Sequence, residues 1–96
     1  MCGIIGISSN KSVSSSIINS LKKLEYRGYD SAGIATLDKG IINEVKCEGR
    51  VKSLEKNISK TEMLGTVGIG HVRWATHGLP STINAHPHSS DTVSVV

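Results

Sequence analysis

The sequence predicts an α+β fold in which short aliphatic strands and two amphipathic helices share one core. Three features indicate this fold: apolar runs of strand length between turn residues, two segments with apolar residues at helical spacing, and a globular composition. Hydrophobic residues make up 38% of the chain and charged residues 20%, a balance that disordered chains do not have. With 96 residues, the chain is expected to form one domain.

The first predicted elements are a buried strand and a helix. Residues 2–7 (CGIIGI) are apolar and contain two glycines that allow close backbone approach, which favours a buried strand. Asn10 or Ser12 is expected to cap the helix that follows, and Gly28 is expected to end it. The apolar residues that form one stripe of this helix are Val13, Ile17, Ile18, Leu21 and Leu24.

A β-hairpin is predicted next. Residues 31–37 and 41–48 have strand character, and the segment 38–40 (DKG) between them predicts a three-residue loop that ends in glycine. The core of the fold must be largely aliphatic, because the chain has one Trp, two Tyr and no Phe.

The second half of the chain predicts one more helix and two more strands. Residues 51–60 have helical spacing, 66–75 read as a strand, and 76–90 form a loop with Gly, Pro, Ser and Asn. Residues 92–96 begin another strand. A chain that stops inside a strand is expected to leave a sheet layer unfinished.

Charge and cysteine usage exclude several classes of protein. The net charge is +3, and basic and acidic residues alternate along 38–62 without forming a block, so a nucleic-acid partner is not expected. Cys2 and Cys47 form no disulfide pattern, and the N-terminus lacks a basic leader. No apolar run approaches the roughly 20 residues of a membrane span, so we expect no membrane partner and a cytoplasmic location.

Cys2 stands where N-terminal catalysis would need it. Methionine aminopeptidases usually remove Met1 when the second residue is small, which leaves a thiol and a free α-amino group on one residue. An α-amino group titrates close to neutral pH, so it can serve as the base for the neighbouring thiol. Gly3 lets substrate and backbone approach the sulfur. The alternative is that Met-Cys-Gly is an accident of a buried strand.

Three segments resemble the class II glutamine amidotransferases. These are MCGIIGI at the start, LKKLEYRGYDSAGIA at 21–35 and GHVRWATHGLPSTINAHPHSS at 70–90. The sequences of these segments are most similar to the glutaminase domain of the aminotransferases that form glucosamine 6-phosphate. The resemblance covers essentially the whole chain and implies part of the four-layer αββα sandwich of the N-terminal-nucleophile hydrolases. It also implies glutamine as the substrate and a γ-glutamyl thioester on Cys2, which water then hydrolyses to glutamate.

The resemblance assigns roles around the nucleophile and the substrate. Arg27 matches the family arginine beside the nucleophile, where a guanidinium favours a thiolate and fixes the N-terminus. Gly28 would bring its backbone near the amine, although a glycine that ends a helix explains it equally well. Arg73 matches the arginine that grips the glutamine α-carboxylate, for which a bidentate fork is suited.

Further positions in the same motif line the implied pocket. Trp74 matches the tryptophan of the glutamine loop, with a core tryptophan as the alternative. Thr76 and His77 would offer hydrogen bonds at the rim of the pocket. The histidines do not join cysteines or carboxylates at zinc spacing, so neither a metal nor a cofactor is expected. Cys47 reads as a small buried residue on a strand.

The chain also departs from the family pattern. The Asn-Gly pair that supplies the family's oxyanion hole follows a strand resembling residues 92–96, and the chain ends at Val96. The downstream aspartate and the sugar-phosphate isomerase domain are absent as well. Residues 1–96 are therefore expected to be an incomplete amidotransferase domain that is inactive alone, either truncated or completed by a separately encoded remainder of the enzyme.

Two alternatives stay open at this point. The chain is either part of a glutamine-hydrolysing enzyme or a non-catalytic remnant that serves as an interaction fragment. Within the enzyme class, the alternatives are the phosphoribosyl-pyrophosphate and asparagine-forming amidotransferases. The YRGYDSAG and RWATHG segments favour the sugar enzyme.

Overall fold

An antiparallel sheet with the strand order β1-β4-β2-β3 is the frame of the molecule. The computed structural model describes residues 1–60, 63–75 and 78–96. The strands of the sheet are β1 Gly3–Ser8, β2 Ser31–Asp38, β3 Ile41–Glu48 and β4 Val67–Arg73. The helical elements are α1 Ser14–Leu24, the 3₁₀ turn η1 Glu25–Arg27 and α2 Val51–Lys60. A second small sheet pairs β5 His88–Ser89 with β6 Ser94–Val95.

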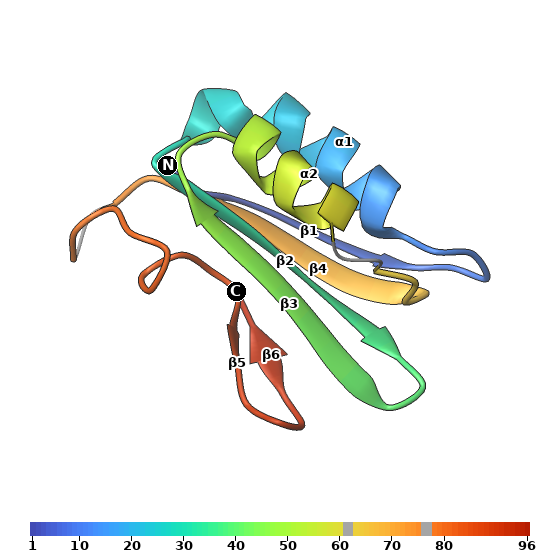
Figure 1. Ribbon diagram of the computed structural model, residues 1–96. Helices are drawn as coiled ribbons and strands as arrows, with labels where there is room; N and C mark the ends of the chain where they lie inside the picture. Colours follow the sequence, from blue (N-terminus) through green and yellow to red (C-terminus); the bar gives the residue numbers. More distant parts are fainter. Residues whose placement is uncertain (61–62, 76–77) are drawn as a thin grey trace.

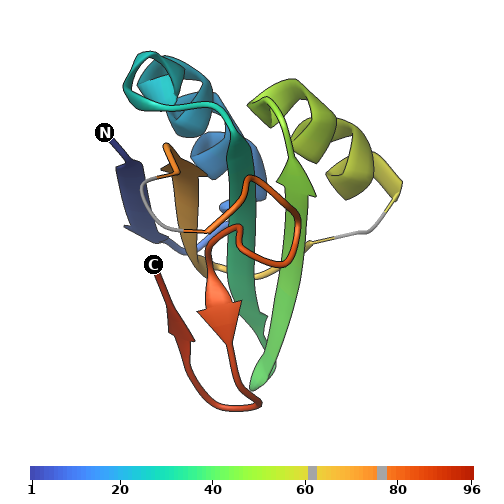
Figure 2. The ribbon, with the colours of Figure 1, turned by 90° about the vertical axis from the view of Figure 1, so that its left-hand side faces the viewer.

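The helices and the β5–β6 hairpin lie on opposite sides of this sheet. Helices α1 and α2 run side by side over one face, and the chain from residue 78 onward crosses toward the other face (Figures 1 and 2). The predicted α+β fold, its two helices and its four long strands are therefore confirmed, with α2 covering the predicted range 51–60. The range 76–90, predicted as loop, contains the short strand β5, and β6 covers only Ser94–Val95 of the strand predicted at 92–96. Within the described parts of the chain, no helix is long and apolar enough to cross a membrane.

The turn between β2 and β3 is shorter than predicted. Asp38 pairs directly with Ile41, so the loop has two residues and Asp38 belongs to the strand. Lys39 and Gly40 both have positive φ, at 50° and 78°. This is the geometry of a type I′ turn, whose twist matches that of the flanking strands.

The predicted cap of α1 is wrong. Val13 occupies the N-cap position, and no side chain caps the first turn. The Ser12 hydroxyl donates instead to the carbonyl of Met63, 3.0 Å away, and the Val13 amide donates to the carbonyl of Gly65. The start of α1 is thus held by the segment that precedes β4, a contact between distant parts of the chain that local cap rules do not anticipate.

Glycines in β4 allow α1 to lie close to the sheet. A Cβ atom at Gly70 would come within 2.6 Å of the Ile17 side chain, and one at Gly68 within 2.7 Å of it. The absence of these side chains lets Ile17 reach the strand and fill the core. The buried core cluster, which is almost entirely aliphatic as predicted, comprises Val13, Ile17, Ile18, Leu21, Ala32, Ile34, Cys47, Val51, Leu54, Met63 and Val72.

The other face of the sheet is covered only in part. Near its centre Gly33 lies under the chain at His86 and Pro87, where a Cβ atom would meet the His86 carbonyl oxygen. Where β4 begins, an apolar hollow of about 220 Å³ opens between the sheet and β6, lined among others by Leu37, Val67 and Thr92. This hollow lies away from Cys2, and the described residues leave several apolar side chains beside it exposed.

Two isoleucines on opposite faces of the sheet test this division into faces. Ile34 of β2 is fully buried under the helices, whereas Ile4 of β1 is 62% exposed on the other face. We expect Ile34→Ala to lower the free energy of unfolding by about 2–5 kcal/mol, because it removes buried methyl groups and leaves a cavity. The matched change Ile4→Ala should cost less than about 1 kcal/mol. Urea unfolding followed by circular dichroism measures both, and equal losses would contradict the assignment of the core.

Candidate active site

The pairing of β1 with β4 brings Cys2 to the end of β4. Gly3 pairs with Val72, so the residue before β1 lies beside the residues that follow β4. The Cys2 sulfur is 3.5 Å from the Trp74 amide nitrogen and 3.8 Å from the Trp74 carbonyl oxygen. Cys2 is exposed, so a reactant can reach its thiol. The thiol thus lies against the backbone of Trp74, close to both its amide and its carbonyl group.

Arg27 holds the backbone at Cys2. Its Nε donates to the carbonyl oxygen of Cys2 over 2.8 Å, and its Nη2 lies 4.0 Å from the Met1 sulfur. The 3₁₀ turn that follows α1 presents this side chain toward the N-terminus. The guanidinium therefore contacts the Cys2 carbonyl rather than a carbonyl at its own helix end, which is the geometry needed to fix the N-terminal residue.

Gly28 lets the chain after α1 pack directly on Trp74. A Cβ atom at Gly28 would lie 2.8 Å from both the Cβ and the amide nitrogen of Trp74. Its own amide donates to the Glu25 carbonyl, which closes the 3₁₀ turn. Gly28 is therefore required by close approach as well as by the helix end, and a side chain there would push Trp74 away.

Arg73 is buried on the face of the sheet away from the helices. Its side chain belongs to the last residue of β4 and is 7% exposed. One guanidinium nitrogen donates to the Leu79 carbonyl over 3.3 Å, and the Asn84 side chain donates to the same oxygen over 2.8 Å. A surface ion pair, the alternative reading of Arg73, is excluded by this burial. The guanidinium instead lies beneath the segment that follows the strand.

Trp74 and Tyr29 form a partly exposed aromatic pair. Trp74 is 49% exposed, which excludes a core tryptophan. Its ring meets the Tyr29 ring edge to face, with centroids 6.1 Å apart. The Arg50 guanidinium carbon lies over the Tyr29 ring, 4.4 Å from its centroid. A pocket of about 240 Å³ beside this pair is lined by Met1, Tyr26, Arg27, Gly28, Tyr29 and Trp74. Thr76 and His77, which we expected at the pocket rim, lie outside the described residues.

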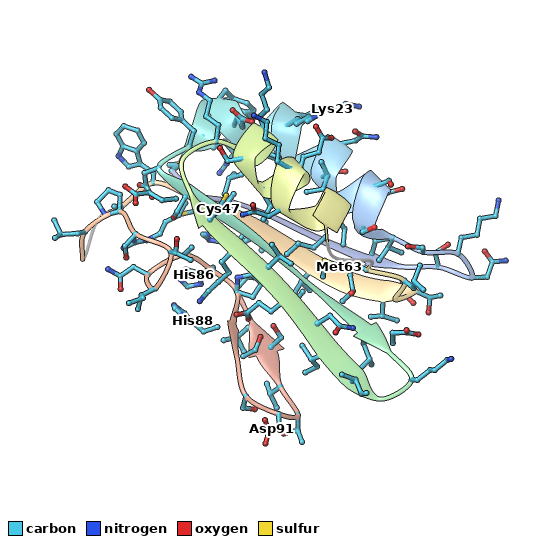
Figure 3. All side chains as sticks on the ribbon, in the orientation of Figure 1. Lys23, Cys47, Met63, His86, His88 and Asp91 are labelled. Atoms are coloured by element: carbon cyan, nitrogen blue, oxygen red, sulfur yellow. The ribbon has the colours of Figure 1, made fainter. Side chains whose placement is uncertain are left out.

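Three histidines lie in contact on the same face as Arg73. The rings of His71 and His86 are 4.5 Å apart and nearly parallel, and His88 lies 4.5 Å beyond His86. Figure 3 shows His86 and His88 together below β3, on the side away from the helices. The rings pack on one another, and the described residues contain no group of three His, Cys, Asp or Glu arranged to hold a metal ion.

Burial disfavours the charged form of two of these rings, His71 and His86. Burial, with smaller contributions from His86, Arg73 and His88, lowers the pKa of His71 from 6.5 to about 4, and only Asp30 opposes the change. Burial, His88, Arg73 and Lys46 also lower the pKa of His86. The Nδ1 atoms of both rings have no hydrogen-bond partner among the described residues. A proton on either ring would therefore add a charge that is desolvated and close to Arg73.

Asp30 is a site residue that sequence reasoning missed. It stands inside the YRGYDSAG motif, but nothing in its local pattern assigned it a role. In the structure its carboxylate accepts a hydrogen bond from the Ala75 amide, and its own amide donates to the Arg73 carbonyl over 3.1 Å. The residue therefore contacts the chain on both sides of Trp74. Cys47, in contrast, is buried as predicted, and burial raises the pKa of its thiol.

Comparison with known proteins shows that the chain is similar along its whole length to glutamine–fructose-6-phosphate aminotransferases. It is 56% identical over 98 aligned residues to the glutamine–fructose-6-phosphate aminotransferase (isomerizing) of Clostridium acetobutylicum, and 53% identical over 96 residues to that of Agrobacterium fabrum. Both alignments cover 100% of this chain but 16% of the relative, so the chain spans a small part of the length of these enzymes. No protein-family model matches it.

A solved structure shares the fold. The glutamine phosphoribosylpyrophosphate amidotransferase from B. subtilis, complexed with ADP and GMP, matches with a TM-score of 0.78 and 26% identity over 98% of this chain and 20% of that chain. This match confirms the expected partial N-terminal-nucleophile hydrolase fold, of which the described residues form a helix layer and a sheet layer.

The histidine cluster predicts a loss of stability in mild acid. Unfolding returns His71 to its usual pKa of 6.5, so between pH 6.5 and about 4 the unfolded chain binds a proton that the folded chain does not. Its contribution to stability is present above pH 6.5 and is lost as the pH falls, by an amount on the order of 2 kcal/mol at pH 5. Urea unfolding at pH 7.5 and pH 5 measures this difference.

Matched glutamine substitutions test the assignment to His71. His71→Gln should reduce the difference between the two pH values, because the buried titrating ring is gone. His88→Gln changes an exposed ring and should leave most of the difference in place. An unchanged pH dependence in His71→Gln would show that another group causes the acid sensitivity.

Proposed function

We propose that this chain, which is homologous along its whole length to the N-terminal glutaminase region of the glutamine–fructose-6-phosphate aminotransferases, supplies the nucleophile and the glutamine-binding arginine of an amidotransferase. The observation that carries the proposal is the meeting of three elements at one end of the sheet. Cys2 precedes β1, Arg27 holds the Cys2 carbonyl, and Arg73 ends the strand that pairs with β1.

The proposed reaction is nucleophilic hydrolysis of the glutamine side chain. After removal of Met1, the α-amine of Cys2 takes the thiol proton, and the sulfur attacks the carboxamide carbon. A carbon–sulfur bond forms, the carbon–nitrogen bond breaks, and the proton leaves with ammonia. Water then attacks the thioester and releases glutamate with regeneration of the thiol. The exposed thiol beside the Trp74 amide is consistent with attack on an incoming substrate.

Arg73 is proposed to bind the α-carboxylate of glutamine. A guanidinium can make two parallel hydrogen bonds to a carboxylate, and its attraction is strong where water is excluded. Arg73 is buried and already donates to one carbonyl of the following segment, so its position is fixed before substrate arrives. Thr76 and His77 remain predictions for the rim of the same pocket.

The chain is proposed to act as one part of a larger catalytic unit. Acyl transfer needs donors for the oxyanion, each worth about 3–4 kcal/mol of transition-state stabilisation, and the resemblance places them beyond residue 96. The partly uncovered apolar face of the sheet fits the packing of further chain there. Transfer of the ammonia to fructose 6-phosphate is the activity for which the relatives are named, and we propose it for the enzyme that contains this chain.

The alternative amidotransferases are less well supported. The chain is 26% identical to the phosphoribosylpyrophosphate enzyme but 51–56% identical to the sugar aminotransferases. The remnant hypothesis makes a different prediction, since a non-catalytic fragment has no reason to keep a formed nucleophile. Labelling of Cys2 by a glutamine analogue therefore separates the enzyme hypothesis from the remnant hypothesis.

The first experiment labels the nucleophile. Incubation with the diazoketone analogue of glutamine should add one molecule of reagent to Cys2, in a chain from which Met1 is absent, because the reagent needs both a glutamine pocket and a reactive terminal thiol. Mass spectrometry of the intact chain and its peptides measures the adduct. Cys2→Ser should abolish labelling, whereas Cys47→Ser, which changes a buried thiol, should not. An unlabelled, folded chain would favour the remnant hypothesis.

The second experiment separates the two arginines. Glutamine should protect Cys2 from the same reagent, and the concentration for half protection reports its affinity. Arg73→Lys should raise this concentration by roughly 10-fold or more, because lysine cannot make the bidentate contact. Arg27→Lys should mainly slow the labelling at saturating reagent, since Arg27 contacts the Cys2 backbone. Unchanged protection in Arg73→Lys would place the carboxylate elsewhere.

A further inference from the structure

Three consecutive residues after the 3₁₀ turn, Gly28, Tyr29 and Asp30, all lie against the chain that leaves β4. Gly28 allows close backbone approach to Trp74, Tyr29 meets the Trp74 ring, and Asp30 bonds to the residues on either side of it. We infer that Asp30 is a positioning residue, which clamps the backbone around Trp74 so that the Trp74 amide points at the Cys2 sulfur. The inference rests on the proposed role of Cys2 as the nucleophile.

The bonds of Asp30 fix both neighbouring peptide units. Its amide donates to the Arg73 carbonyl over 3.1 Å, and its carboxylate oxygen Oδ2 accepts from the Ala75 amide. The bonded Arg73 carbonyl and the bonded Ala75 amide belong to the peptide units before and after Trp74. With both units held, the Trp74 N–H has one direction, toward the Cys2 sulfur 3.5 Å away.

Asp30 is itself anchored on the remaining sides. Its second carboxylate oxygen accepts from the Ser31 hydroxyl over 3.0 Å, and Ser31 is fully buried. The Asp30 carbonyl accepts from the Gly49 amide over 2.8 Å, which ties the residue to the end of β3. A side chain with these partners is held in one rotamer, so it can fix the position of the chain after β4 relative to the sheet.

The clamp lies where the sheet no longer supplies partners. The last pair of the β2–β4 ladder is Ser31 with Arg73, so Ala75 lies beyond it. There the Asp30 carboxylate accepts a hydrogen bond from the Ala75 N–H, so the residue before β2 still bonds to the chain that follows β4. A charged acceptor makes a stronger bond to an amide than a neutral one does. A backbone N–H aimed at sulfur favours the negative charge that forms when the thiol reacts.

The charge of Asp30 and its hydrogen bond to Ala75 can be removed separately, which makes the inference testable. Asp30→Asn removes the charge and keeps an oxygen that can accept from Ala75. Asp30→Ala removes both. If Asp30 acts by position, the asparagine variant retains reactivity that the alanine variant loses.

The experiment measures alkylation of Cys2 by iodoacetamide at pH 7 in the full 96-residue chain, with peptide mass spectrometry to separate the two cysteines. Asp30→Ala should slow alkylation of Cys2 by roughly three- to tenfold, the effect of losing one hydrogen bond, and Asp30→Asn should stay within about twofold of the unaltered chain. Asp38→Ala, at the other end of β2, is the matched control and should have no effect. Trp74 is the only tryptophan, so its fluorescence should change in Asp30→Ala alone.

Buried Cys47 reports the fold in the same samples. It should stay unreactive in every folded variant, and its labelling in Asp30→Ala would show unfolding. In that case the test uses Asp30→Asn, in which Cys2 should react within about twofold of its rate in the unaltered chain. Hydrogen exchange should also show a protected Ala75 amide in both the unaltered chain and Asp30→Asn. Three results would overturn the inference. The Ala75 amide could exchange without protection, or Cys2 could react in folded Asp30→Ala at the rate of the unaltered chain. Asp30→Asn could also slow the alkylation of Cys2 as much as Asp30→Ala does.

The design keeps this inference separate from the proposed function. Iodoacetamide needs neither a glutamine pocket nor a free N-terminal amine. If the diazoketone analogue fails to label Cys2 while the iodoacetamide pattern holds, only the amidotransferase proposal fails. If labelling by the analogue succeeds and the iodoacetamide rates do not depend on Asp30, only the positioning role fails.

Discussion

The central place of β4 in the sheet is the constraint on which the rest of the molecule depends. Its neighbours are β1 on one side and β2 on the other, and both run antiparallel to it. The residues before β1 and β2 therefore meet the residues after β4 at one end of the sheet. Cys2, Asp30 and Trp74 come together for this reason, although 72 residues separate the first from the last. Gly68 and Gly70 maintain the arrangement because they admit α1 to the same strand.

Local patterns predicted the elements well because each pattern reports a local cause. Apolar periodicity located α2 and the four long strands. The motif residue Arg27 contacts the N-terminus, and Arg73 contacts the segment that follows β4. The errors arose where distant chain decides the outcome. Ser12 bonds to Met63 instead of capping its helix, and Asp30 gains its partners only when β2 lies beside β4. No spacing rule contains such contacts, since they depend on the assembled sheet.

The face of the sheet opposite the helices combines two requirements that conflict. Arg73 binds a carboxylate through its positive charge in the proposed function, yet it is buried beside three histidines whose rings contact one another. The conflict is resolved by keeping the buried histidine rings uncharged, since the pKa of His71 is lowered to about 4. Neutral rings fill the space under the chain at His86 without repelling the guanidinium. Gly33 completes the arrangement by letting that chain touch the sheet.

The order of events at the N-terminus follows from which atom of Cys2 is held. Arg27 bonds to the Cys2 carbonyl, which lies on the far side of the residue from the Met1–Cys2 peptide bond. Removal of Met1 breaks that peptide bond and the contact of Arg27 with the Met1 sulfur, but leaves the bond to the carbonyl intact. The pairing of Gly3 with Val72 is equally untouched. The new amine would thus form on a residue whose backbone is already oriented, with its sulfur against the Trp74 peptide, so the proposed nucleophile would need no rearrangement of the sheet to become active.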